Sequence, residues 1–300
     1  MTTLKVGTRT SQLALWQTNY IMQELQTAWP DVHWELRSFV TSGDKTLDQP
    51  LPMIGGKGLF TAELEQALLN GEIDLAVHSL KDLPVRLPDG LTLGAIPPRA
   101  DVRDALISGQ GRTLATLPEG AVVGTSSLRR QAQLLVHRPD LIIRSIRGNV
   151  DTRLRKAQAG DYDAVILAAA GLTRLNLTDP ISEWLSLETM LPAPGQGALA
   201  VQCRADDTAT LTLLAAIHDG VTAAATQAER SFLAGLGGGC SAPIAAYVHY
   251  DGTALRLAGF VGTSDGRQTI RIQGTGEDPF SLGYQCAQQA LAEGAEAFLV

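Results

Sequence analysis

The sequence predicts an α/β protein of two similarly built α/β domains, followed by a smaller α+β domain. Up to residue 215, short apolar runs alternate with helical patterns, an order typical of a largely parallel sheet covered by helices. The stretches VGTRTSQLALWQ (6–17) and VGTSSLRRQAQL (123–134) both run from a strand through Gly-Thr and hydroxyl residues into an amphipathic helix. The last third contains three alternating runs separated by turn residues, which indicates a three-stranded antiparallel sheet.

The first half begins with the strand LKVGT (4–8), and a helix is expected from about Gln12. Further elements are the expected strands HWELRSFV (33–40), IDLAVHS (73–79) and LTLGAI (91–96), and a helix at TAELEQALL (61–69). Each strand-to-helix turn offers a helix N-terminus that favours anions. Ordinary Ser or Thr capping produces the same pattern, and it uses the same backbone groups.

The segment TSGDKTLDQPLPMIGGKG (41–58) has no periodic pattern and is rich in glycine and proline. A structureless connection of this length is usually a lid, a binding loop or disordered. Its two lysines, Lys45 and Lys57, favour a lid over an anionic ligand.

The second half repeats the pattern with the strand-like runs AVVG (121–124) and LIIRSI (141–146), each followed by a helix. In the first helix, the positions expected to face the core are Leu128, Ala132 and Leu135. In the second helix, Asp151 is the expected N-cap. The residues expected to pack inward there are Val150, Leu154 and Ala157.

Turn formers cluster at two junctions, IPPRADVRD (96–104) and LPAPGQG (191–197). Two crossings imply that the chain leaves the first half, builds the second and returns through the strand GALAVQCR (197–204). The expected domains are residues 1–97 with 198–215, residues 103–191, and residues 220–300. The third is expected to contain a helix at 222–236, strands at 243–251, 254–262 and 267–275, and a helix near 281–297.

Composition indicates a soluble globular protein, expected in the cytoplasm. The chain is 45% hydrophobic, but its longest apolar run, AVILAAAGL (164–172), is too short to span a bilayer, and its start does not resemble a signal peptide. Three widely spaced cysteines, Cys203, Cys240 and Cys286, argue against a disulfide framework and fit a reducing compartment. The histidines are scattered, so no metal site is expected.

The distribution of charge is more informative than the net charge of −7, which speaks against nucleic-acid binding. Between Arg129 and Lys156, eight cationic side chains face only two acidic ones, which gives a local charge of +6. These arginines follow two strand-like runs, so both sets can reach one rim of the sheet. That convergence indicates a pocket for a polyanion, because guanidinium groups bind carboxylates in a bidentate way. Solvated helix faces are the alternative interpretation.

The loop LGGGCSAP (236–243) places Cys240 at the entrance of the third domain. Glycines around it let the backbone bring the sulfur close to a bulky group. A cysteine on a loop is either inert or, as a thiolate near arginines, a site of covalent chemistry.

The motif HSLKDLP (78–84) puts Ser79, Lys81 and Asp82 at the carboxyl end of a strand, where open α/β sheets bind ligands. Asp82 before Leu-Pro either shapes a turn or faces a cleft. In a cleft, its carboxylate could stabilise a cation or transfer a proton.

Eight motifs, in order along nearly the whole chain, resemble the porphobilinogen deaminase family, also called hydroxymethylbilane synthases. They are VGTRTSQLALWQ, TSGD, GGKGLFTAELEQALL, HSLKDLP, GTSSLRRQAQL, IRGNVDTRL, APGQGALAVQCR and LGGGCSAPI. The resemblance implies a transferase that joins four porphobilinogen molecules head to tail, with loss of ammonia, into the linear tetrapyrrole hydroxymethylbilane. It also implies first and second domains like those of periplasmic solute-binding proteins, a monomer, and porphobilinogen as the partner, with no nucleic acid and no membrane.

The resemblance implies that Cys240 holds a dipyrromethane cofactor, made from substrate, through a thioether bond. Asp82 matches the catalytic aspartate, which is expected to pair with pyrrole N–H groups and stabilise the azafulvene-like cation formed as the amine departs. Other residues expected to bind the cofactor are Lys81, Thr125, Ser127, Arg129 and Arg130. Residues expected to bind substrate are Arg9, Ser11, Arg147, Arg153, Arg174 and Gln196. Lys57 and Phe60 are the expected lid residues.

The sequence departs from the family pattern at Ala242, where a β-branched residue is expected, and at Ala100, where an acid is frequent. Two other functions remain open. A non-enzymatic anion-binding module would explain the arginines but leaves Cys240 without a role. A cysteine-dependent acyl transferase or hydrolase is weakened because no histidine lies in a comparable motif. Only the deaminase would carry two additional pyrrole units in its intact mass.

Overall fold

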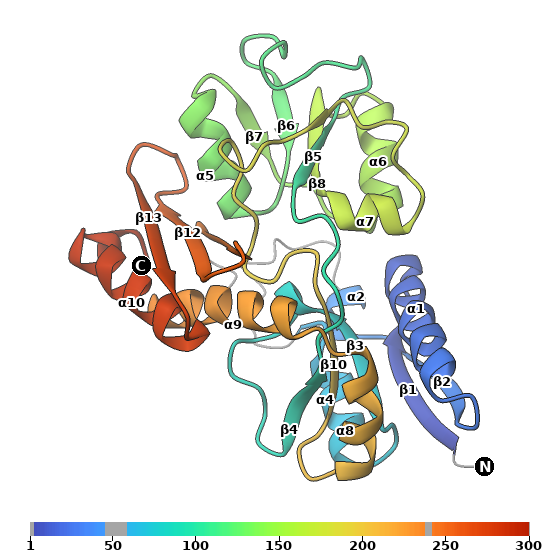
Figure 1. Ribbon diagram of the computed structural model, residues 1–300. Coiled ribbons are helices and arrows are strands. Elements are labelled where there is room, and N and C mark those ends of the chain that lie inside the picture. The colour runs from blue at the N-terminus through green and yellow to red at the C-terminus, as the bar shows by residue number, and fades with distance from the viewer. Residues whose placement is uncertain (1–2, 46–58, 238–241, 300) are drawn as a thin grey trace. The chain divides into compact units, whose positions relative to one another are not determined.

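The computed structural model describes residues 3–45, 59–237 and 242–299 (Figure 1). The chain divides into two compact units. The described residues up to Ala100, together with Ala198–Ala223, form the first unit. Those of Asp101–Gly197 and Ala224–Val300 form the second. The expected division into three domains stays a prediction.

The first unit contains a five-stranded sheet with the order β2-β1-β3-β10-β4. Its strands are β1 (Thr3–Arg9), β2 (His33–Phe39), β3 (Leu75–Ser79), β4 (Leu91–Ala95) and β10 (Leu199–Arg204). The strands β2, β1 and β3 are parallel, whereas β10 is antiparallel to both of its neighbours. The predicted returning strand is therefore confirmed, and it lies inside the sheet.

The longer helices of the first unit form where apolar residues recur at helical spacing. Helices of this unit are α1 (Gln12–Ala28), α2 (Ser42–Lys45), α4 (Ala62–Leu69) and α8 (Thr208–Leu214), with short 3₁₀ turns η1 (Leu80–Asp82) and η2 (Ala215–Ile217). The buried face of α1 includes Ile21 and Leu25, which pack with Val6, Leu75 and Val77 of the sheet. The hydroxyl of Ser11 accepts a hydrogen bond from the Ala14 amide at 3.3 Å, so it caps α1, in agreement with the alternative interpretation of this turn as ordinary Ser or Thr capping.

The second unit contains a sheet of related topology, with the order β7-β6-β8-β5-β9. Its strands are β5 (Asp104–Ile107), β6 (Val122–Gly124), β7 (Ile142–Arg144), β8 (Ala164–Ala168) and β9 (Glu183–Trp184). As in the first unit, three parallel strands are followed by one antiparallel strand, here β5. The helices that follow the parallel strands are α5 (Leu128–His137), α6 (Val150–Gln158) and α7 (Ala169–Arg174). The prediction of two similarly built halves is confirmed.

The buried faces of α5 and α6 differ in part from the sequence prediction. On α5 the buried residues are Arg129, Arg130, Ala132, Gln133 and Leu134, while Leu128 and Leu135 are only half-buried. Leu135 packs against the core of this sheet as predicted, whereas Leu128 is not part of that cluster. Arg129 and Arg130 are buried instead, beside a buried carboxylate. On α6, Leu154 and Ala157 are buried as predicted, but the N-cap is Asn149 and not Asp151.

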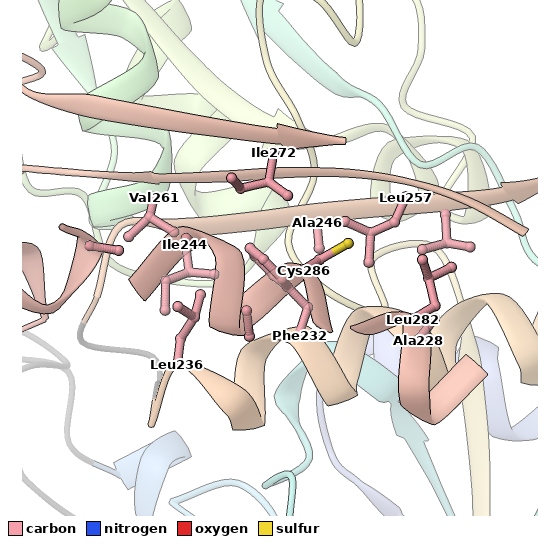
Figure 2. Packing of buried hydrophobic residues seen from close by; sticks show 14 of the residues in the cluster. Ala228, Phe232, Leu236, Ile244, Ala246, Leu257, Val261, Ile272, Leu282 and Cys286 are labelled. Atoms are coloured by element: carbon pink, nitrogen blue, oxygen red, sulfur yellow. The ribbon is translucent and has the colours of Figure 1, made fainter. Parts of the chain in front are cut away.

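The C-terminal part of the second unit confirms the expected α+β pattern. The strands β11 (Ile244–Tyr250), β12 (Leu255–Gly262) and β13 (Thr269–Gly276) pair in antiparallel order. Helix α9 (Gly220–Gly235), whose residues from Ala224 on belong to this unit, and α10 (Pro279–Ala292) supply the other side of the core. The short turn η3 (Ala295–Phe298) follows. Figure 2 shows Phe232 of α9 and Cys286 of α10 beside Ile244, Leu257 and Ile272 of the sheet.

Candidate active site

The first group of predicted site residues lies where β1 and β3 end. These two strands are adjacent and parallel, so their carboxyl ends meet at one edge of the sheet. Arg9 ends β1, Ser11 caps α1, and Lys81 and Asp82 follow β3 in η1. The guanidinium carbon of Arg9 lies 4.3 Å from the centroid of the Phe60 ring. We call these five residues, Arg9, Ser11, Phe60, Lys81 and Asp82, the first rim.

Asp82 is exposed on this rim, although the backbone that carries it is anchored. The side chain of Leu80 is fully buried in a small apolar cluster with Leu83 and Ala198. The Leu80 amide donates to the carbonyl of Ala198 at 3.0 Å, and the Leu83 amide donates to the carbonyl of Leu80 at 3.2 Å. No hydrogen bond or ion pair of the Asp82 carboxylate is found within the described residues. The turn therefore uses buried leucines and backbone bonds, and the carboxylate is available to a ligand.

Two buried polar side chains, Gln17 and His78, lie beneath the first rim, and neither was a candidate from the sequence. The amide nitrogen of Gln17 on α1 donates to the hydroxyl of Ser79 at 2.9 Å, which links α1 to the end of β3. His78 is 5% exposed, and its burial lowers the pKa to about 4. Its imidazole is therefore neutral at neutral pH. Nothing in the spacing of a single histidine could have identified this position.

The second group of predicted residues follows β6 and β7, which are parallel neighbours in the second unit. Thr125 and Ser127 lie between β6 and α5. The hydroxyl of Thr125 accepts from the Ser127 amide at 3.2 Å, and the hydroxyl of Ser127 accepts from the Arg130 amide at 3.4 Å. Arg147 precedes α6, and Arg153 lies within it. We call these residues, together with Arg129 and Arg130, the second rim.

Arg129 and Arg130 are buried beside a carboxylate that the sequence analysis missed. Asp104, at the start of β5, is fully buried. Its Oδ2 accepts from Nη2 of Arg129 at 2.8 Å, and its Oδ1 accepts from Nη2 of Arg130 at 2.7 Å. Burial alone would raise the pKa of Asp104, but the two guanidinium groups outweigh it and hold the pKa well below its usual range. The cluster thus contains two cations and one anion.

The remaining bonds of the two arginines go to backbone carbonyls. Nη1 of Arg129 donates to Leu191 at 2.6 Å, and Nη1 of Arg130 donates to Ile166 at 3.1 Å. Nε of Arg130 is buried and has no hydrogen-bond partner among the described residues. One donor of this rigid pair is therefore unused.

Other predicted residues contact the backbone near the junctions of the second unit. Nε2 of Gln196 donates to the Val102 carbonyl at 2.8 Å and to Oδ1 of Asp104 at 2.9 Å. Nη2 of Arg174 donates to the Gly197 carbonyl at 2.8 Å. Arg153 donates through Nε to the Gly148 carbonyl at 2.8 Å, which shapes the turn before α6. These side chains are already held in place by the second unit itself.

Two predicted site residues, Cys240 and Lys57, lie outside the described residues. The other two cysteines, Cys203 and Cys286, are free and buried, in β10 and α10 respectively. Burial raises the pKa of the Cys203 thiol to about 11, so this sulfur is a poor nucleophile. Across the described ranges, the helices are all too short or too polar to cross a membrane.

Comparison with known families gives matches along most of the chain. Residues 4–212 match the model of the family domain "Porphobilinogen deaminase, dipyromethane cofactor binding domain". Residues 223–292 match "Porphobilinogen deaminase, C-terminal domain".

Individual relatives cover nearly all of the chain as well. Porphobilinogen deaminase from Brevibacillus brevis is 54% identical over 292 residues, which covers 97% of this chain and 94% of that protein. Porphobilinogen deaminase from Syntrophotalea carbinolica is 51% identical over 298 residues, covering 99% and 95%. Among solved structures, the aliphatic sulphonate binding protein SsuA from Escherichia coli matches at 14% identity with a TM-score of 0.42, covering 78% of this chain and 70% of that chain.

Proposed function

This chain belongs to the porphobilinogen deaminase family, and we propose that Asp82 is its catalytic carboxylate and Cys240 the attachment point of its dipyrromethane cofactor. The activity is that of a transferase in tetrapyrrole biosynthesis. It joins four porphobilinogen molecules head to tail, releases ammonia and yields hydroxymethylbilane. The observation that carries the assignment is the match of both family domains to one chain. Its rims present a cationic cluster and a carboxylate that has no partner among the described residues.

The described residues fit a ligand that carries both carboxylates and pyrrole N–H groups. Asp82 offers an exposed acceptor without a partner in the described structure. The pair Arg129 and Arg130 has one positive charge more than Asp104 neutralises, and the buried Nε of Arg130 has no hydrogen-bond partner among the described residues. When bound, the dipyrromethane supplies the pyrrole carbon to which the first substrate unit is joined.

We propose that Asp82 accepts hydrogen bonds from pyrrole N–H groups and stabilises positive charge that develops as the substrate loses its amine. A carboxylate placed where charge develops lowers the barrier, and it can also take up the proton released when the new bond forms. The anchored backbone supports this role, because buried Leu80 and two backbone hydrogen bonds fix the turn from which the carboxylate extends. Lys81 lies beside it in η1 and would bind a carboxylate of the ligand.

We propose that the other predicted residues bind the acetate and propionate groups that every porphobilinogen unit carries. On the first rim these are Arg9 and Ser11. In the second unit they are Thr125, Ser127, Arg129, Arg130, Arg147, Arg153, Arg174 and Gln196. Hydrogen bonds that involve a charged partner contribute about 1.5 to 3 kcal/mol each, so several of them hold a growing polyanion through successive additions. Lys57 and Phe60 are proposed as lid residues.

We also propose that the protein acts as a monomer in the cytoplasm. Its two described cysteines are free thiols, which fits a reducing compartment. Light scattering coupled to size-exclusion chromatography tests the first part, and a mass near 31.8 kDa is expected.

Intact mass spectrometry tests the covalent attachment. The purified protein is expected to exceed its sequence mass by two pyrrole units, and Cys240→Ser is expected to lose that excess because its hydroxyl is a much weaker nucleophile. Cys203→Ser is the matched control, since it removes a buried thiol that we assign no role. A Cys240→Ser protein that keeps the full excess would refute the attachment point. A wild-type protein without any excess would refute the cofactor.

A further inference from the structure

The cluster of Arg129, Arg130 and Asp104 has an arrangement that binding of a ligand alone does not explain. Both guanidinium groups are buried, at 5% and 7% exposure, and both lie against one carboxylate that is completely buried. Two cations at this proximity repel each other, and each loses its hydration when it leaves water. Without the carboxylate, they would not remain side by side in this interior position.

Asp104 holds this geometry through both of its oxygens. One oxygen accepts from Arg129 and the other from Arg130, so the carboxylate fixes the orientation of each guanidinium plane. Oδ1 also accepts from Gln196 at 2.9 Å. The backbone carbonyls of Leu191 and Ile166 complete the support from the other side. Asp104 is therefore the centre of a network that joins β5, α5 and the junction at 191–197.

The charges of this network do not balance. One carboxylate faces two guanidinium groups, which leaves one positive charge in a region of low dielectric constant. The buried Nε of Arg130 also lacks a hydrogen-bond partner within the described structure. A second carboxylate beside the pair would neutralise the excess positive charge and accept a hydrogen bond from Nε of Arg130. Every unit of the proposed oligopyrrole carries two carboxylates.

We propose that Asp104 is a positioning residue for carboxylate binding at the second rim: it holds Arg129 and Arg130 side by side and leaves one charge for the ligand. The proposal rests on the proposed function, which supplies the carboxylated ligand. Asp104 itself does not touch the ligand. It acts through the two arginines, so its effect depends on its charge and not only on its volume.

Asp104→Asn and Asp104→Glu separate charge from packing. Asparagine keeps the shape but removes the charge, and glutamate keeps the charge but adds a methylene to a full interior. Asp140→Asn is the matched control. Asp140 pairs with Arg138 at the opposite end of α5, through contacts of 2.8 and 2.6 Å, and lies at the surface. Asp140→Asn changes the net charge by the same amount as Asp104→Asn, and Asp140 lies outside both rims.

The readouts are the fraction of purified, folded protein that carries the extra mass, the KM for porphobilinogen, and the melting temperature. We expect Asp104→Asn to lower the loaded fraction and to raise KM roughly tenfold, the scale of one lost charged hydrogen bond. Asp104→Glu is expected to melt as early as Asp104→Asn yet to load close to the wild-type level. Asp140→Asn is expected to load and bind like wild type.

Three outcomes would overturn the proposal. Asp104→Asn could load fully with an unchanged KM, Asp104→Glu could load as poorly as Asp104→Asn, or Asp140→Asn could lower loading to the same degree. A wild-type protein without extra mass would instead refute the proposed function, so the two failures are distinguishable.

If neither Asp104 variant folds, the wild-type protein provides the test. Its ¹⁵N spectrum of arginine side chains is compared with that of Cys240→Ser, in which the cofactor is not attached. Because Asp104 holds them, the guanidinium groups of Arg129 and Arg130 are expected to rotate slowly in both proteins and therefore to give separate, unaveraged signals. These signals are expected to shift when the cofactor is attached. Averaged signals, or identical spectra in the two proteins, would contradict the proposal.

Discussion

The two rims hold their charged groups in opposite ways. On the first rim, Asp82 is exposed and has no partner among the described residues, while buried leucines and backbone hydrogen bonds anchor the turn that carries it. On the second rim, Arg129 and Arg130 are buried, and Asp104 and backbone carbonyls hold them in place. The difference teaches that a group can be oriented either through its backbone or through its own charged end.

This difference matches the two tasks that we propose. A catalytic carboxylate must change its partner as each new substrate unit arrives, so a side chain without fixed contacts suits it. A site that holds a polyanion through many additions benefits from guanidinium groups that are already oriented, because less side-chain entropy is lost on binding. The predictions below test this comparison, from the largest expected effect to the smallest.

Asp82→Asn is expected to separate turnover from stability. Turnover should fall about a thousandfold, within the range that one acid or base group contributes. The melting temperature should stay unchanged, because the carboxylate is exposed and makes no contact within the described structure. The measurement is product formation beside a thermal melt. Asp89→Asn, at another exposed aspartate of the same unit, is the control and should keep normal turnover.

Unlike Asp82→Asn, Asp104→Asn is expected to lower the stability of the protein strongly. It leaves two buried cations without their counter-ion, a change that typically costs about 3 to 5 kcal/mol of unfolding free energy. Urea unfolding at neutral pH measures it. Asp140→Asn removes the Arg138–Asp140 pair, which lies just beyond the end of α5 and is partly exposed, and it should cost much less. Equal losses in the two variants would contradict the contrast between the rims.

His78 makes the stability of the first unit depend on pH, which the sequence did not reveal. Its folded pKa of about 4 lies below the ordinary value of 6.5, so the unfolded chain binds more protons between these pH values. Stability from this group is complete above pH 6.5 and is lost as the pH falls toward 4, by about 3 kcal/mol in total. His78→Gln should flatten this slope in urea unfolding across that range. An unchanged slope would show that the imidazole is not buried in neutral form.

The two serine caps should contribute equally, since they have the same geometry on the two rims. Ser11 accepts from Ala14 at 3.3 Å and Ser127 accepts from Arg130 at 3.4 Å. Ser11→Ala and Ser127→Ala are each expected to lower the unfolding free energy by about 1 kcal/mol. A much larger loss for Ser127→Ala in urea unfolding would show that the second rim depends on this cap as well as on Asp104.

Periodic patterns predicted most of the regular elements. The runs at 33–40 and 73–79 form β2 and β3, because each combines apolar and β-branched or aromatic residues between turn formers. The helices at Gln12 and at 222–236 follow from apolar residues at helical spacing. The strand β5 was missed, because it is only four residues long and follows directly on a stretch of turn formers.

The candidate site was predictable only where a motif carries its own chemistry. The motif at 78–84 pointed to Asp82, and the structure places it at the carboxyl end of β3. Asp104 could not be found in the same way, because its partner Arg129 is 25 residues away and no local spacing connects them. The burial of Arg129 and Arg130 was missed for the same reason, since charged side chains are expected at the surface unless a partner is known.

The central claim is that this chain extends a covalently held oligopyrrole one unit at a time. The most direct measurement is the intact mass of the purified protein after addition of about one to three equivalents of porphobilinogen. We predict a series of species above the starting mass, separated by one pyrrole unit each and absent in Cys240→Ser. A single unchanged mass in a preparation that forms hydroxymethylbilane would contradict the account.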